Sequence, residues 1–108
     1  MQNQGLTKNQ LKASTFLNEQ LQYLETKHRL RFEKRRTSCP FHSEANPSMS
    51  QYIDKDGVVR FHCFGCGINE DIFGIMGRLE KHASFNVCFS TFRRFVEEKR
   101  KWGTNAKP

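Results

Sequence analysis

Four side chains that can bind a metal ion form two closely spaced pairs in this chain. Two residues separate Cys39 from His42, and two separate Cys63 from Cys66. Such spacing lets a tight turn bring both members of a pair onto one ion, and three thiolates with one imidazole complete a tetrahedral zinc shell. A shell closed by four protein ligands leaves no position for water or substrate. We therefore expect one zinc ion (Zn2+) that stabilises the fold and takes no part in a reaction.

The remaining cysteine and histidines are weaker candidates as ligands. His62 adjoins Cys63, but neighbouring residues of a strand point to opposite faces. Cys88 stands among apolar residues of an expected helix, which indicates an ordinary buried thiol. His28 and His82 have no partner at the same spacing, so we expect them to serve the surface or the core.

Length and composition indicate one small domain. A chain of 108 residues builds a marginal hydrophobic core, for which a bound metal is a common remedy. No apolar run approaches the roughly 20 residues that span a membrane, and the first residues lack the layout of a signal peptide. We expect a cytoplasmic protein with no membrane partner, whose reduced cysteines favour zinc over disulfides.

The charge is strongly basic and unevenly distributed. The formal net charge is +7. Residues 27–36 hold six Lys or Arg and one Glu, and residues 93–101 hold five Lys or Arg and two Glu. Residues 37–92, which contain the metal ligands, are mildly acidic. Two basic flanking segments suggest a polyanionic partner.

The first 27 residues predict an amphipathic helix. Thr7 is a suitable N-cap for a helix over 7–27. An apolar stripe recurs at helical spacing and is typical of a core-facing surface, with a partner-binding helix as the alternative. The stripe comprises Leu11, Leu17, Leu21, Leu24 and His28.

Alternation and turn residues predict three strands, over 29–34, 48–53 and 58–63. Leu30 and Phe32 would point inward from the first strand. Asp56-Gly57 predicts the tight turn between the other two, because glycine accepts the positive φ of such turns. Phe61 and Phe64 are expected to pack around the zinc.

Two helices are predicted after the second metal-binding pair. One covers 71–81, and a longer one is capped by Ser84. The fold class is therefore α+β, with an antiparallel sheet of three or more strands between an N-terminal helix and C-terminal helices. We divide the chain into the helix 1–27, a zinc-ribbon domain 28–100 and a polar tail 101–108.

Several motifs together resemble the N-terminal zinc-binding domain of bacterial-type DNA primases. They run from Cys39 to Glu44, Asn46 to Ser48, Phe61 to Gly67, Asp71 to Phe73 and Ser84-Phe85. The resemblance covers roughly residues 28–100. It implies a zinc ribbon whose ligands are Cys39, His42, Cys63 and Cys66. It also implies binding of single-stranded template DNA, which helps to choose where an RNA primer begins.

The chain departs from the primase pattern in three respects, one of which is that the stretch after residue 80 is less like the family than the two metal-binding pairs are. Glu70-Asp71 stands where many members of that family have Gly-Asp. Nothing after residue 100 could form the acidic, metal-binding catalytic domain that joins nucleotides. We therefore expect no catalysis by this chain alone. It would be either the first domain of a longer primase or a small relative that acts beside other replication proteins.

Basic and aromatic residues near the ribbon form the candidate DNA surface, because single-strand binders combine a basic groove with aromatic stacking platforms. For each residue alone, a solvated charge or cross-strand packing is an equally good interpretation. The candidates are Lys34, Arg35, Arg36, Tyr52, Arg60 and His62. A second basic patch on the last helix contains Arg93, Arg94, Lys99, Arg100 and Lys101.

Two other functions compete with DNA binding. In the first, the ribbon is a scaffold and the leucine stripe of 11–24 recruits a polymerase or helicase. Exposure of that stripe would favour this adaptor, and its burial would favour the DNA-binding module. The second is an enzyme, which is disfavoured because Glu44, Glu70 and Asp71 form no paired-carboxylate pattern.

Overall fold

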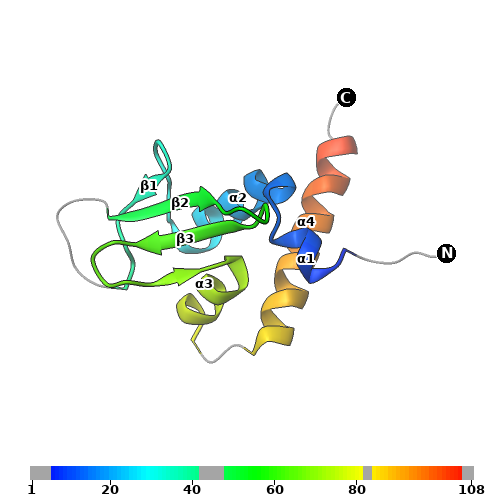
Figure 1. Cartoon of the computed structure of the whole chain (residues 1–108). Coiled ribbons are helices and arrows are strands. Elements are labelled where there is room, and N and C mark those ends of the chain that lie inside the picture. The colour runs from blue at the N-terminus through cyan, green and yellow to red at the C-terminus, as the bar shows by residue number, and fades with distance from the viewer. Residues whose placement is uncertain (1–5, 42–47, 82–83, 106–108) are drawn as a thin grey trace.

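The computed structural model describes residues 6–41, 48–81 and 84–105, with side chains as far as Arg100. It contains a four-stranded antiparallel sheet in the order β1-β2-β3-β4, with helices before and after it (Figure 1). The predicted α+β class is confirmed. The elements are α1 (Lys8–Leu11), the 3-10 turn η1 (Ser14–Phe16), α2 (Leu17–His28), β1 (Arg36–Thr37), β2 (Met49–Ile53), β3 (Val59–Cys63), β4 (Asn69–Glu70), α3 (Ile72–Leu79) and α4 (Phe85–Asn105).

The N-terminal segment is not the single helix that we predicted over 7–27. Thr7 does cap α1, because its hydroxyl accepts from the Gln10 amide at 3.2 Å. The helix then ends because the backbone of the next residues forms hydrogen bonds with the sheet. The Val59 amide donates to the Lys12 carbonyl at 3.0 Å, and Ala13 forms an antiparallel bridge with Val58.

The leucine stripe faces the core, as expected. Leu11 and Leu24 are fully buried. Leu17 and Leu21 are half-buried and pack against the same core. Burial of these side chains leaves α2 without the exposed apolar face that an adaptor helix would need.

The predicted strand over 29–34 is wrong. Arg29 ends α2 in a left-handed conformation, with φ of 59°. The chain then makes a two-residue hairpin turn between Glu33 and Arg36, and β1 begins only at Arg36. Leu30 and Phe32 nevertheless point inward: Leu30 is buried, and the Phe32 ring lies 5.6 Å from that of Phe61. Alternation therefore identified the inward side chains but not the backbone conformation.

The central hairpin and the last two helices agree with the predictions. Gly57 has φ of 81°, and Asp54 Oδ1 accepts from the amides of Asp56 and Val58. Asp71 caps α3 through the Gly74 amide. The Ser84 hydroxyl accepts from the Val87 amide at the start of α4. Helix α4 continues to Asn105 and so enters the range 101–108 that we expected to be a polar tail.

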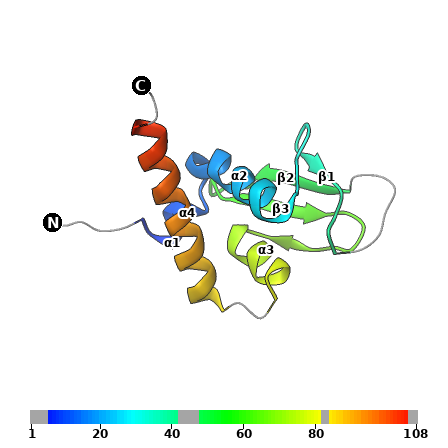
Figure 2. The ribbon, with the colours of Figure 1, turned by 180° about the vertical axis from the view of Figure 1, so that it is seen from behind.

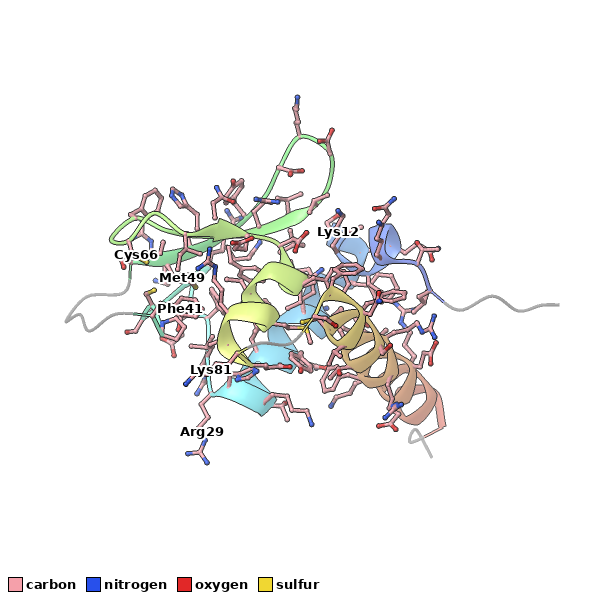
Figure 3. The ribbon with its side chains drawn as sticks, turned by 90° about the horizontal axis from the view of Figure 1, so that it is seen from below. Lys12, Arg29, Phe41, Met49, Cys66 and Lys81 are labelled. Atoms are coloured by element: carbon pink, nitrogen blue, oxygen red, sulfur yellow. The ribbon has the colours of Figure 1, made fainter. Side chains whose placement is uncertain are left out.

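Helix α4 and the metal-binding cysteines lie at opposite ends of the sheet. Figures 1 and 2 show α4 beyond the end at which β2 turns into β3. Cys66 lies at the opposite end, as Figure 3 shows. The buried face of the sheet carries Met49, Val59, Phe61 and Cys63 into the same core as α2 and α3. Within the described residues, no helix has the length and apolar character needed to cross a membrane.

Candidate metal centre and open sheet face

Three cysteines meet at the end of the sheet away from α4. Cys39 follows β1, Cys63 ends β3, and Cys66 lies in the turn that leads to β4. That turn is tight: the Gly67 amide donates to the Cys63 carbonyl at 2.8 Å. Gly67 has φ of 81°, which a residue with a side chain rarely adopts. The glycine therefore allows the chain to reverse directly after the second cysteine pair.

The spacing of the sulfurs fits a tetrahedral zinc ion. The Sγ atoms of Cys39, Cys63 and Cys66 all lie within 4.8 Å of one another. Those of Cys39 and Cys66 are 3.8 Å apart. With Zn–S bonds of about 2.3 Å, tetrahedral geometry requires sulfurs roughly 3.8 Å apart. These three thiols can thus occupy three corners of one zinc shell without rearrangement of the backbone.

Hydrogen-bond donors surround the thiols. The Phe41 amide donates to Cys39 Sγ at 3.4 Å, and the Cys66 amide donates to Cys63 Sγ at 3.4 Å. Ser48 Oγ lies 3.3 Å from Cys63 Sγ. Burial raises the pKa of the Cys39 thiol. Burial also acts to raise the pKa of Cys63, but the hydrogen bonds from Ser48, the Cys66 amide and the other two thiols together outweigh it and lower that pKa. Such donors stabilise the thiolates that metal binding requires.

The remaining histidines and the fourth cysteine lie outside this cluster or outside the described residues. His42, the predicted fourth ligand, lies outside the described residues, as does His82. His62 points away from Cys63: Cys63 is fully buried, whereas the His62 ring lies 4.5 Å from that of the exposed Phe64. Cys88 is buried in α4. His28 contacts Glu80, with 2.9 Å between Nε2 and Oε2.

Comparison with known families agrees with this arrangement. The family model described as CHC2 zinc finger matches residues 8–101. The chain belongs to the CHC2 zinc finger family. Zinc is the metal that this family binds, and the Cys39, Cys63 and Cys66 cluster provides a site for it.

Curated relatives of this CHC2 zinc finger chain are DNA primases. The chain is 44% identical to the DNA primase of Thermotoga maritima over 45 residues, which are 42% of this chain and 7% of that protein. It is 43% identical to the DNA primase of Deinococcus radiodurans over 47 residues, 44% of this chain and 8% of that protein. The DNA primase of Aquifex aeolicus is 32% identical over 60 residues, 56% of this chain and 11% of that protein. The aligned part is therefore a small fraction of each relative. No solved structure gave a match.

The open face of the sheet brings four of the predicted DNA-binding residues together. Register places Arg36 opposite Ser50, Ser50 opposite His62, and His62 opposite Asn69, so these side chains form a row across all four strands. Tyr52 lies opposite Arg60 on the same face. The four predicted residues on this face are Arg36, Tyr52, Arg60 and His62. Lys34 and Arg35 lie instead in the hairpin turn that precedes β1.

Hydrogen bonds hold part of this face in a fixed arrangement. Arg60 donates from Nε to Asn69 Oδ1 and from its terminal nitrogen to the Asn69 carbonyl, both at 3.0 Å. Asn69 Nδ2 in turn donates to the Tyr52 hydroxyl at 3.0 Å. Asn69 was not among the predicted residues. A two-residue strand gives no sequence pattern, so its pairing with β3 had no signal in the sequence.

Phe64 also belongs to the open face, contrary to our prediction. We expected it to pack around the zinc with Phe61. Phe61 is fully buried, but 64% of Phe64 is exposed. Extension of the strand alternation by one residue beyond Cys63 places Phe64 on the side of His62, and this signal was available in the sequence. An exposed phenylalanine beside a histidine adds a second aromatic surface to this face.

The second basic patch, on α4, is largely engaged in packing. Arg100 pairs with Glu19 at 3.6 Å and lies 4.3 Å from the centre of the Phe16 ring. Arg93 pairs with Glu97 at 3.8 Å, and the Lys99 amine lies 5.6 Å from the Phe95 ring centre. Arg100 therefore helps to fix α4 against the N-terminal segment, whereas the contacts of Arg93 and Lys99 lie within α4 itself. The Lys101 side chain lies outside the described residues.

Proposed function

We propose that this chain is a single-stranded-DNA-binding module of DNA primase type, which assists template recognition during primer synthesis. In this proposal Arg36, Tyr52, Arg60 and His62 contact the strand from the open face of the sheet. Lys34 and Arg35 contact it from the adjoining turn. The observation that carries the proposal is the shared face of these basic and aromatic residues across β1, β2 and β3.

The chemistry of the open face suits an unpaired strand better than a duplex. Bases of a single strand are free to stack on aromatic side chains, while arginine neutralises the phosphates. Phe64 and His62 offer adjacent rings, and Tyr52 is 38% exposed. Because Arg60 is held by Asn69, its guanidinium is already oriented before DNA binds.

In the same proposal the metal has a structural role. Cys39, His42, Cys63 and Cys66 would hold zinc in a closed shell, which fixes β1 and the β3–β4 turn relative to each other. Those two segments carry Arg36 and Phe64, which belong to the open face. The bound metal would supply stability to this end of the sheet, and the DNA contacts would come from the protein side chains.

The chain would act with other components of a replication complex. The CHC2 region aligns with a small fraction of each primase relative, so we infer that nucleotide joining belongs to a separate catalytic domain. That domain, a helicase or a polymerase would be the protein partner, in the cytoplasm. The adaptor alternative required an exposed leucine stripe, and Leu11 and Leu24 are fully buried. No observation favours it.

Fluorescence anisotropy with labelled single-stranded oligonucleotides tests the proposal. The zinc-loaded protein should bind, and its affinity should fall steeply as salt rises. Replacement of Arg35 and Arg36 by alanine should weaken binding while one zinc per chain is retained. Absence of binding at low salt by the folded, zinc-loaded protein would exclude the proposed function. Equal affinity for duplex DNA would contradict its single-strand character.

A further inference from the structure

The turn between Glu33 and Arg36 has a conformation that its residues disfavour. The Glu33 amide donates to the Arg36 carbonyl at 2.8 Å, and the Arg36 amide donates back to Glu33 at 3.0 Å. The turn therefore has two central residues, Lys34 and Arg35, and both are left-handed, with φ of 52° and 68°. Asn-Gly is the preferred pair in such turns, because a side chain with a normal Cβ is disfavoured at positive φ.

Basic residues also occupy left-handed positions elsewhere in the chain. Among the described residues, the non-glycine positions with positive φ are Arg29, Lys34, Arg35 and Lys81, and all four are basic. Arg29 and Lys81 follow α2 and α3, and Figure 3 labels them on the same side of the molecule. A positive charge near the C-terminus of a helix is favourable in itself. The hairpin has no helix end to complement, so its two charges need a different explanation.

A basic hollow lies beside the hairpin. Its volume is about 510 Å³. Three basic side chains and two hydroxyl groups line it, together with one carboxylate: Arg31, Lys34, Arg36, Thr37, Ser38 and Glu33. The Glu33 carboxylate opposes an anion, but 75% of it is exposed and it lies 3.9 Å from Arg31 Nε. The lining therefore keeps a net positive charge, with hydroxyl donors beside it.

We propose that this hairpin and its hollow bind the phosphates of the single strand, while the open face of the sheet contacts its bases. The inference rests on the proposed function and adds which part of the DNA each surface holds. The hairpin precedes β1 (Figure 1). Arg36 of β1 belongs to both surfaces, because it lines the hollow and lies opposite Ser50 on the open face. A strand whose backbone lies along this edge could therefore place its bases over His62 and Tyr52. Charge is kept at Lys34 and Arg35 despite the conformational cost because the phosphates require it.

The double variant Lys34→Asn/Arg35→Gly separates folding from binding. It supplies the preferred turn residues, so the midpoint of thermal unfolding should rise by about 5 °C. Affinity for a single-stranded oligonucleotide should fall at least tenfold. The slope of log K against log salt should become shallower by about 1.4, because two phosphate contacts are lost. The losses should be equal for oligonucleotides of different base composition.

Arg29→Gly/Lys81→Gly is the matched control, because it removes two charges and two left-handed side chains outside the hairpin. It should gain stability and keep most of its affinity. Glu33→Gln should act in the opposite direction and strengthen binding severalfold. Equal losses in the two double variants would assign the effect to net charge and overturn the inference, as would unchanged binding in the hairpin variant. If the wild-type protein bound no oligonucleotide, both the proposed function and this inference would be wrong.

Discussion

The Tyr23 hydroxyl donates to Glu80 Oε2 across 2.6 Å and so joins α2 to the end of α3. His28 Nε2 lies 2.9 Å from the same carboxylate oxygen. The Tyr23 ring also packs edge-on against Phe92 and Phe95 of α4, with centroid distances of 5.6 and 5.1 Å. One buried tyrosine thus connects the three main helices.

This connection should make the fold sensitive to alkaline pH. Burial, together with the bond to Glu80, raises the pKa of Tyr23 well above its usual value. A raised pKa means that the folded state holds the proton more tightly than the unfolded state. The contribution of Tyr23 to the free energy of unfolding is therefore complete below about pH 10 and is lost as pH rises above it. Urea unfolding at pH 8 and pH 10.5 should show a decrease in the free energy of unfolding.

Tyr23→Phe should lower stability at pH 8 by about 1 kcal/mol and should reduce the alkaline decrease. Tyr52→Phe is the matched control, since that hydroxyl is exposed on the open face. It should retain the alkaline decrease of the wild-type protein. An equal pH dependence in wild type and Tyr23→Phe would show that other groups cause the effect.

Removal of zinc should unfold the ribbon. The three thiols hold segments that are far apart in sequence, and a domain of this size depends strongly on a bound metal. A chelator should therefore abolish the strand signal in circular dichroism, and Cys63→Ser should prevent zinc binding. Cys88→Ala provides a control, because Cys88 is buried in α4 away from the cluster. That variant should lose some stability but still bind one zinc per chain. Retention of the full fold without metal would contradict the structural role.

His42 is the predicted fourth ligand, and a pair of histidine variants tests it. His42→Ala should weaken zinc binding strongly, because an open coordination position replaces the imidazole. His62→Ala should leave zinc binding unchanged, since its ring lies against Phe64 and points away from Cys63. The measurement is zinc affinity by competition with a chromogenic chelator. If His62→Ala weakened zinc binding and His42→Ala did not, the ligand assignment would be wrong.

The sequence predicted the cysteine cluster better than it predicted the backbone around it. The two-residue spacing and Gly67 define a local turn, so Cys63 and Cys66 were constrained by neighbours in sequence. The break in the N-terminal helix was not local, because it depends on the bond from Val59 to the Lys12 carbonyl. In the segment 29–34, polar and apolar residues alternate as in a strand. Residues 29–32 nevertheless pair with no described strand, and Glu33 forms only a bridge with Arg36, so no strand forms there. In these two segments the hydrophobic pattern of the sequence therefore identified the buried side chains. Hydrogen bonds to distant residues determined where the helices and strands begin and end.

Phe64 offers the most direct test of the open face, because it is exposed and its removal should not affect the core. Stacking of one base on an aromatic ring contributes about 1–3 kcal/mol. Phe64→Ala should therefore reduce single-strand affinity by roughly 5–150-fold, with no change in the salt slope and little change in thermal stability. Phe85→Ala is the matched control, since Phe85 is 47% exposed but lies on α4, outside the sheet that carries the open face. It should bind DNA as the wild-type protein does. Equal affinity of Phe64→Ala and wild type would remove this ring from the DNA surface and leave Tyr52 and His62 as its aromatic part.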